Sequence, residues 1–196
     1  MSRGLLARRR ALLVLGACGV GAVALAAGAA DHAAALAAIR QGGVVVVMRH
    51  AVAPGTFDPE GFTLGDCRTQ RNLDDAGRAQ ARRIGDWFRA HALAPATVRS
   101  SQWCRCRDTA RLAFGSAVDW PALNSQIRSG PDPETAEALR AALAQLPRGG
   151  FEVWVTHQVN INHLAGEATA SGEAVVLRPA DPGAAGVRVL ARLRID

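Results

Sequence analysis

The sequence predicts an α/β fold, a three-layer sandwich in which helices cover both faces of a mostly parallel central sheet. The segment from Gly42 to Met48 contains four consecutive valines after two glycines. Such a short, β-branched apolar run is typical of a strand buried on both faces. A short leading helix is expected over Asp31–Arg40, and helical and strand segments then alternate along the chain. That alternation indicates a parallel sheet with crossover helices.

The next elements continue this order without an interior linker long enough to separate domains. The segment from Asp74 to Ala90 predicts a helix, because Asp74 can cap its N-terminus and apolar residues recur at helical spacing. A short second strand is expected over Thr97–Ser100. The following helix, Arg105–Phe114, should end at Gly115, since glycine readily closes a helix.

The C-terminal third repeats the pattern. A helix is expected from about Pro133 to Leu146, where Pro147 stops it. A third apolar strand follows over Phe151–Thr156, and two more strand candidates are Ala174–Arg178 and Val187–Ile195. The last of these alternates apolar and polar residues, as a half-buried strand does.

Residues 1–30 have the composition of an export signal. Arg8 to Arg10 precede an uncharged stretch from Ala11 to Ala30, and a basic start with an apolar middle is the pattern of a secretory signal. The paired arginines also resemble a twin-arginine signal, and the box ending at Cys18 resembles a lipoprotein cleavage site. Twenty apolar residues could equally remain as a membrane anchor. We expect a signal or anchor over 1–30 and a periplasmic domain over 31–196, with a cleaved signal preferred, then a lipid anchor, then a retained helix.

The net charge of +6 does not indicate a nucleic-acid partner. Four of the 23 basic residues, all arginines, lie in residues 1–30, whereas all 17 acidic residues lie at Asp31 or later. The remaining chain has 19 arginines against 17 acidic residues, a net charge of +2. A nucleic-acid binder should show a basic stripe, so we exclude that class.

Three cysteines follow the first thirty residues: Cys67, Cys104 and Cys106. In an oxidising periplasm, Cys67 is expected to form a disulfide with either Cys104 or Cys106. A metal site is the alternative, but the chain has no Cys-x-x-Cys pair and the Cys-Arg-Cys spacing is tight. We therefore favour a disulfide and expect one thiol to remain.

Polar side chains follow three of the predicted strands. Arg49 and His50 follow the first strand, Ser100–Ser101 lead from the second strand to Arg105, and His157 follows the third. In open α/β sheets, ligands bind beyond the carboxyl ends of the strands. Guanidinium forks match phosphate oxygens, and a neutral imidazole can attack phosphorus while a second one stabilises the transferring oxygens. The sequence thus indicates a phosphoryl-transfer site.

Four ordered segments resemble the motifs of the histidine phosphatase superfamily, which includes the cofactor-dependent phosphoglycerate mutases. They are Val47–His50, Asn72–Ala81, Ser100–Ala110 and Val155–His157. One Arg-His pair would carry little weight, but four motifs in order and in suitable strand and helix context are specific. The resemblance covers about Val44 to His157 and implies a phosphoglycerate mutase-like fold.

The resemblance also implies a role for each matching residue. His50 would be the nucleophile that becomes phosphohistidine, and Arg49 and Arg105 would clamp the phosphate. His157 would bind the phosphoryl oxygens from the opposite side. Water would then hydrolyse the labile intermediate, so that a phosphomonoester is hydrolysed without a metal or an organic cofactor.

A finer resemblance concerns the small periplasmic members of the superfamily. Cys67–Leu73 and Trp103–Cys106 look most like these members, some of which act on phosphorylated envelope sugars such as lipopolysaccharide core heptose phosphate. The implied partner is a small phosphorylated substrate, and any membrane association would use the N-terminal segment. The oligomeric state is not predicted.

Two departures from the family pattern concern catalysis. Ala51 replaces the usual glycine and crowds the phosphate-facing loop, and Gln158 follows His157 where some members carry an aspartate proton donor. No glutamate occurs around 123–126, and a general acid contributes about a hundredfold or more. The carboxylates that could supply the proton are Asp58, Asp66, Asp132 and Glu134. We favour Glu134, and leaving groups of low pKa would need it less.

The unassigned proton donor keeps a second hypothesis open, a phosphate-binding module of the same fold without turnover. A mutase is a third hypothesis, disfavoured because the short interior connections offer little for a lid that excludes water. Substrate specificity should come from the insertions at 51–71 and 115–133.

Overall fold

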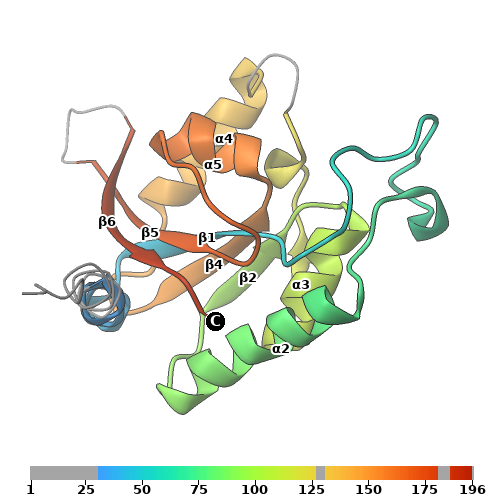
Figure 1. The fold of residues 1–196 in the computed structure, drawn as a ribbon. Coiled ribbons are helices and arrows are strands. Elements are labelled where there is room, and N and C mark those ends of the chain that lie inside the picture. The colour runs from blue at the N-terminus through green and yellow to red at the C-terminus, as the bar shows by residue number, and fades with distance from the viewer. Residues whose placement is uncertain (1–30, 127–130, 181–185, 196) are drawn as a thin grey trace, which may run out of the picture.

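A six-stranded sheet forms the centre of the computed structural model, which describes residues 31–126, 131–180 and 186–195 (Figure 1). The predicted signal or anchor over 1–30 lies outside these residues. Within the described ranges, no helix is both long enough and apolar enough to cross a membrane. A helix covers 31–41, where the leading helix was expected.

The sheet has the strand order β3-β2-β4-β1-β5-β6. The first four of these strands run parallel, whereas β5 and β6 are antiparallel to their neighbours. This confirms the mostly parallel sheet. The strands are β1 (Val44–Arg49), β2 (Thr97–Ser100), β3 (Val118–Asp119), β4 (Phe151–Thr156), β5 (Ala174–Pro179) and β6 (Val187–Leu193).

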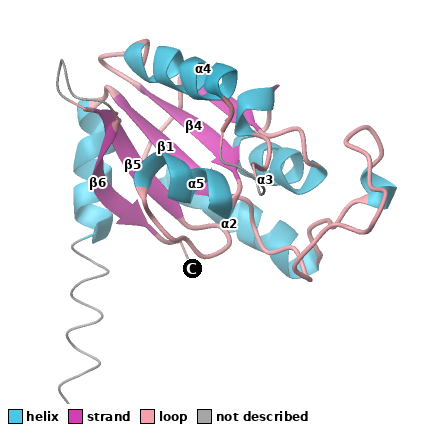
Figure 2. Ribbon diagram, turned by 90° about the horizontal axis from the view of Figure 1, so that it is seen from above, coloured by secondary structure: helices cyan, strands magenta, loops and turns pink. Residues whose placement is uncertain are grey.

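Helices cover both faces of the sheet, so the molecule is the expected three-layer sandwich (Figures 1 and 2). The helix at 31–41, α2 and α3 share one apolar core with the sheet, and α4 and α5 share a second core on the other face. The labelled helices are α2 (Asp75–Ala90), α3 (Cys104–Phe114), α4 (Pro133–Ala144) and α5 (Gln158–Ala165). Two 3₁₀ turns, η1 (Cys67–Thr69) and η2 (Pro121–Leu123), lie in the connections.

Strand β1 lies between β4 and β5 and is buried on both faces. Val44, Val46 and Met48 belong to the core under α2 and α3, whereas Val45 and Val47 belong to the core under α4 and α5. Because successive side chains point to opposite faces, an unbroken valine run fills both cores. The central strand, which ends next to His50, is thereby fixed from both sides.

The helix ends mostly follow the expected signals. The Asp74 side chain accepts a hydrogen bond of 2.8 Å from the Gly77 amide and caps α2, and Gly115 ends α3 with a φ of 84°. Helix α4 ends at Ala144 instead of Leu146, because the residue before a proline is disfavoured in helical conformation. Strand β3 was not predicted, since both of its residues are exposed and form no apolar pattern.

Candidate active site

The two parallel central strands bring the two candidate histidines together. Arg49 of β1 lies opposite Thr156 of β4 in the sheet register, and the His50 amide donates a hydrogen bond of 3.0 Å to the Thr156 carbonyl. His50 and His157 therefore follow neighbouring strand ends, with ring centroids 5.6 Å apart. The predicted convergence of these histidines is confirmed.

The protonation of His50 suits a nucleophile. Its Nδ1 lies 2.7 Å from the Ala51 carbonyl oxygen; because a carbonyl only accepts, Nδ1 carries the proton and Nε2 carries the lone pair. Burial, together with the charges of Arg105, Arg49 and Arg71, lowers the pKa of His50 to about 3 against the opposing effect of the Ala51 hydrogen bond. The imidazole is thus neutral at any ordinary pH.

Ala51, which replaces the usual glycine, turns its side chain into the protein. It is fully buried in a small cluster with Ala53, Leu73 and Ala81, and it is not among the residues that line the cavity beside His50. Its amide donates a hydrogen bond of 3.0 Å to the Thr109 hydroxyl of α3. The extra methyl group therefore packs beneath the loop, and the carbonyl remains available to orient His50.

Arg105 lies in the first turn of α3 and is almost completely buried. Its Nε donates to Nε2 of His50 at 3.2 Å, and its Nη1 donates to Oδ1 of Asp58 at 2.8 Å. A third nitrogen, Nη2, lies 3.5 Å from Nδ1 of His157. The guanidinium thus stands between the two imidazoles, where a phosphoryl group would be bound.

Arg49 is held by the segment that follows α5. Its Nη1 donates a hydrogen bond of 2.9 Å to the Thr169 carbonyl, while its buried Nε has no partner within the described residues. Gln158 fixes this segment, because its Oε1 accepts from the Thr169 amide at 2.7 Å and its Nε2 donates to the Glu167 carbonyl at 3.2 Å. The side chain found where an acid was considered is therefore used to support Arg49.

His157 is positioned from behind by a polar chain. Its Nε2 lies 2.9 Å from the Ser101 hydroxyl, which donates to Oδ1 of Asn124 at 3.2 Å. Burial and the charge of Arg105, with smaller effects of His50 and the other arginines, lower the pKa of His157 well below its ordinary value. With the Ser101 proton directed to Asn124, Nε2 of His157 carries the ring proton and Nδ1, on the Arg105 side, is an acceptor. In the other tautomer, in which Ser101 donates to Nε2 instead, Nδ1 carries the proton and can donate a hydrogen bond to a phosphoryl oxygen.

These groups line one cavity of about 180 Å³. A larger apolar groove of about 320 Å³ lies beside α4 and α5 and shares none of its lining residues. The smaller cavity is the site candidate because titratable and cationic groups converge there. Its lining residues are Arg49, His50, Thr56, Phe57, Asp58, Arg71, Arg105, Ser125, His157, Gln158 and Val159.

The structure brings one of the four acid candidates to this cavity. Glu134, the favoured candidate, is exposed in the first turn of α4 and does not line the cavity. Asp132 caps the same helix by accepting from the Thr135 amide, and Asp66 caps η1 and pairs with Arg68.

Asp58 lies in the cavity wall, but its hydrogen bonds are those of an ionised carboxylate. Oδ1 accepts from Nη1 of Arg105 at 2.8 Å and from the Arg71 amide at 3.0 Å, and Oδ2 accepts from Nε1 of Trp103 at 3.1 Å. Burial alone would raise the pKa of Asp58, but these hydrogen bonds and the charge of Arg105 lower it below its ordinary value. Asp58 therefore has no proton to give near neutral pH.

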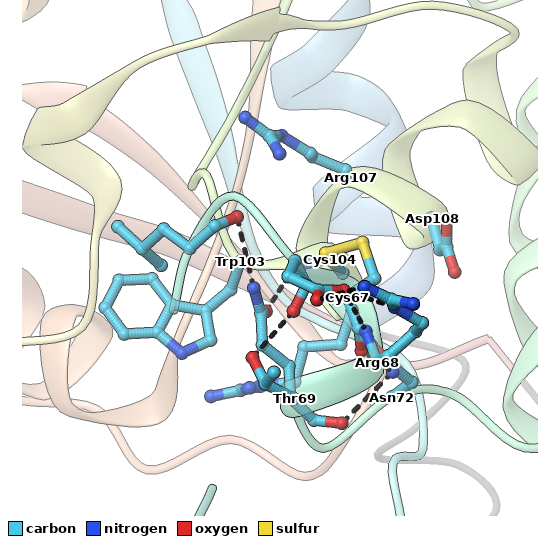
Figure 3. The surroundings of a disulfide bond; sticks show 12 residues. Cys67, Arg68, Thr69, Asn72, Trp103, Cys104, Arg107 and Asp108 are labelled. Atoms are coloured by element: carbon cyan, nitrogen blue, oxygen red, sulfur yellow. Dashed lines mark hydrogen bonds and ion pairs between the residues drawn. A yellow bond between two sulfur atoms is a disulfide. The ribbon is translucent and has the colours of Figure 1, made fainter. Parts of the chain in front are cut away.

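The disulfide joins Cys67 to Cys104, the residue directly before Arg105 (Figure 3). Cys106 stays reduced and buried, and burial raises the pKa of its thiol to about 12. Among the described residues, no group of three or more histidine, cysteine or acidic side chains is placed to hold a metal ion. The bridge instead fastens the 51–73 loop to the start of α3.

Arg71 is the charged residue of the described cavity wall that the sequence did not identify. It lies two positions before Leu73 in the segment that leads into α2, and no spacing or periodicity distinguishes it from the other 22 basic residues. The available signals were its place inside a recognised segment and its closeness to Cys67. Only the fold of the loop brings it to His50.

Comparisons with known proteins give a family match and a fold match. The family model described as "Histidine phosphatase superfamily (branch 1)" matches residues 45–124, a range that contains Arg49, His50 and Arg105. A search of the curated proteins found no significant match.

Three solved structures share the fold. "Structure of the protein histidine phosphatase SixA complexed with tungstate" matches with a TM-score of 0.55 and 17% identity, over 76% of this chain and 96% of that chain. The putative phosphohistidine phosphatase SixA from Agrobacterium tumefaciens matches with a TM-score of 0.53 and 22% identity, over 77% and 97%. The putative alpha-ribazole-5'-P phosphatase from Escherichia coli K-12 matches with a TM-score of 0.54 and 17% identity, over 76% and 95%. At these identities the likeness confirms the fold class.

Proposed function

Because the histidine phosphatase superfamily model matches residues 45–124, we propose that the chain is a member of this superfamily and hydrolyses phosphomonoesters through a phosphohistidine formed on Nε2 of His50. The observation that carries this proposal is the hydrogen bond between Nδ1 of His50 and the Ala51 carbonyl. It leaves the lone pair of Nε2 on the side of Arg105. A neutral, oriented imidazole beside buried guanidinium groups is suited to attack phosphorus.

In the first step, Nε2 of His50 forms a bond to phosphorus as the phosphorus–oxygen bond of the ester breaks. The electron pair of the broken bond goes to the leaving oxygen, which takes a proton from water. Arg49 and Arg105 bind the phosphoryl oxygens, and His157, in the tautomer that carries the proton on Nδ1, donates a hydrogen bond to one of them. These groups stabilise the charge on the transferring phosphoryl group, and such preorganised donors are typically the largest contribution to catalysis.

In the second step, a water oxygen attacks the phosphorus of the phosphohistidine. The nitrogen–phosphorus bond breaks, its electron pair returns to Nε2, and the attacking water releases a proton to the solvent. The products are inorganic phosphate and neutral His50. The hydrogen bond from Nδ1 to Ala51 holds the ring in place during both displacements.

The leaving group should govern the rate, because no carboxylic acid in the described cavity wall is free to protonate it. Asp58 is engaged by Arg105 and Trp103, and a missing general acid costs about 10² to 10⁴ in rate. Aryl phosphates and nitrogen-linked phosphoryl compounds should react faster than alkyl phosphates. An envelope sugar phosphate, the substrate of some small periplasmic members that the sequence resembles, would be a slow substrate unless it protonates its own leaving oxygen.

The test is phosphate release from para-nitrophenyl phosphate in the presence of EDTA. The wild-type protein should be active, and rapid quenching without acid should trap protein heavier by one phosphoryl group. His50→Ala should lose both activity and the mass increase. His163→Ala is the matched control, since His163 is an exposed histidine of α5 outside the His50 cavity.

Equal activity of the wild-type and His50→Ala proteins would disprove the proposal. To test the leaving group, we would compare para-nitrophenyl phosphate with glucose 6-phosphate under the same conditions. We expect kcat/KM, which reports the first displacement, to be at least a hundredfold higher for the aryl ester. Equal kcat/KM values would mean that an acid acts in the site after all.

A second candidate function is a phosphate-binding module without turnover. It is favoured by the ion pair of Asp58 with Arg105, which leaves the described cavity wall without a carboxylic acid that could donate a proton. Binding of inorganic phosphate in calorimetry, together with absence of the trapped phosphoryl-protein, would select this function. Detection of the trapped intermediate would reject it.

We also propose that the chain is exported and that residues 1–30 direct it. The Cys67–Cys104 disulfide supports this, because such bonds persist in oxidising compartments. When the full-length sequence is expressed in a Gram-negative host, the protein should be recovered from the periplasm with an N-terminus near Ala29. Recovery of full-length chain from the cytoplasm with Cys67 reduced would contradict the proposal.

A further inference from the structure

Arg71 places a third guanidinium in the wall of the His50 cavity. Its side chain is half-buried, and its Nη1 donates a hydrogen bond to the Ala53 carbonyl. Its Nε is buried and has no hydrogen-bond partner within the described residues. A buried donor without a partner is costly, so this nitrogen is available for a ligand.

The backbone of Arg71 is fixed beside Arg105. The Arg71 amide donates a hydrogen bond of 3.0 Å to Oδ1 of Asp58, and the Arg71 carbonyl oxygen lies 3.4 Å from Nη1 of Arg105. Asp58 in turn accepts from the same Nη1 at 2.8 Å. The loop therefore holds Arg71 and Arg105 in one rigid arrangement, with Asp58 between the Arg71 backbone and the Arg105 fork.

The charge of the cavity wall is unbalanced in favour of cations. Arg49, Arg71 and Arg105 are its basic residues and Asp58 is its one acidic residue among those described, which gives a net charge of +2. His50 and His157 add no charge, because both are neutral. Burial and the neighbouring guanidinium groups lower the pKa of both Arg49 and Arg71, which shows that the cations destabilise one another. An anion of two negative charges would relieve this repulsion.

We propose that Arg71 binds the phosphoryl group as a third guanidinium, and that the resulting charge selects dianionic phosphomonoesters over monoanionic esters. The inference rests on the proposed function, since it concerns the same site. Asp58 limits the excess charge to that of one phosphoryl dianion. A sulfate monoester has the same shape but one negative charge less, so it should bind weakly.

The first experiment measures binding of inorganic phosphate by calorimetry, with no turnover required. Arg71→Gln removes the charge and the guanidinium fork, and should weaken binding by about ten- to a hundredfold, the range expected for a lost charged hydrogen bond. Arg71→Lys keeps the charge but not the fork, so its phosphate affinity should lie between that of the wild type and that of Arg71→Gln. Arg68→Gln is the matched control, because Arg68 belongs to the same loop, has a side chain that is 89% exposed and pairs with Asp66.

The second experiment measures charge selectivity with para-nitrophenyl sulfate as a competitive inhibitor of para-nitrophenyl phosphate hydrolysis. The wild-type protein should bind the phosphate ester much more tightly than the sulfate ester, and Arg71→Gln should reduce this ratio at least tenfold. If Arg71 had only a structural role, Arg71→Gln would weaken the binding of both esters equally. For any variant of low yield, the rise in Tm on adding inorganic phosphate can replace calorimetry as the measure of phosphate binding.

Phosphate binding by Arg71→Gln within twofold of the Arg68→Gln control would overturn the inference, even if the wild-type protein is an active phosphatase. A wild-type protein that binds phosphate through Arg71 but releases none from the ester would overturn the proposed function alone. The two failures are therefore distinguishable.

Discussion

Nε of Arg105 lies 3.2 Å from Nε2 of His50, so the guanidinium donates a hydrogen bond to the lone pair that would attack phosphorus. Before substrate binds, the lone pair of the nucleophile is therefore engaged by Arg105, the residue that would bind the phosphoryl group. Arrival of a phosphoryl group gives the Arg105 donors charged oxygens to bind, and these are stronger acceptors than a neutral imidazole. Substrate binding would therefore release the lone pair at the moment when it is needed.

Arg105→Lys should lower kcat/KM by about 10² to 10³, the loss typical of removing a donor that stabilises the transition state. Lysine keeps the positive charge but cannot hydrogen bond to His50, Asp58 and phosphate at once. Steady-state kinetics with para-nitrophenyl phosphate measure the effect. Arg107→Lys is the control, because Arg107 lies on the same helix and pairs with Asp119 outside the cavity. Equal losses in the two variants would mean that the Arg105 fork has no special role.

The neutral His50 makes stability depend on pH in a defined direction. In the folded protein the pKa of His50 is about 3, whereas its ordinary value is 6.5. Between these values the unfolded chain binds a proton that the folded protein does not, so the free energy of unfolding falls as the pH is lowered. For His50 alone, the loss from pH 7 to pH 5 should be about 2 kcal/mol.

Urea unfolding of the wild type, His50→Gln and His163→Gln at both pH values isolates this contribution. From pH 7 to pH 5, the free energy of unfolding should decrease by about 2 kcal/mol less in His50→Gln than in the wild type. In His163→Gln it should decrease by the same amount as in the wild type. The absolute stability of each variant does not enter the comparison. An identical decrease in all three proteins would show that His50 titrates normally.

Much of the architecture could be predicted, because local patterns and burial agree there. The Val44–Val47 run is apolar on both faces, Asp74 is a good cap, and each predicted site residue follows a strand or starts a helix. The positions of His50 and His157 then follow from parallel strand pairing alone. These features depend on short-range periodicity and on one rule about strand ends.

The proton donor and the third arginine could not be predicted, because both depend on the path of a loop. The 51–66 segment has no periodicity, so nothing indicates that Asp58 turns inward while Asp66 and Glu134 stay outside the cavity wall. Likewise, the sequence left Cys104 and Cys106 equally able to bond Cys67. The choice of Cys104 follows from the side of α3 that faces η1, a tertiary contact.

Loss of the Cys67–Cys104 disulfide should destabilise the protein by about 4 kcal/mol, from the entropy of closing a loop of that length. The bond spans 37 residues. The Cys67→Ser and Cys104→Ser double variant should show the full decrease in the free energy of unfolding. Dithiothreitol should reproduce it in the wild type and have no effect on the double variant. Phosphate affinity should also fall, because the bond fastens the Asp58 loop to Arg105. Unchanged stability and affinity in the double variant would contradict this prediction.

Gly77→Ala should impair both stability and catalysis, because Gly77 lets α2 contact the loop after His50. A Cβ at position 77 would lie 1.9 Å from the Val52 carbonyl oxygen, so the loop must move. That loop includes the Ala51 carbonyl, which fixes the proton on Nδ1 of His50. Overpacking of this kind costs about 1–3 kcal/mol, and displacement of the carbonyl should lower kcat as well.

Gly85→Ala separates these two effects. Its Cβ would lie 2.2 Å from the Ala113 carbonyl oxygen, a comparable clash between α2 and α3 that does not involve the 51–53 loop. Both variants should lose stability in urea unfolding, but at a temperature where both are folded only Gly77→Ala should lose kcat. If kcat falls equally in both variants, the loss comes from disturbed packing of α2 in general. The orientation of His50 then does not depend on the close approach of Gly77 to the Val52 carbonyl.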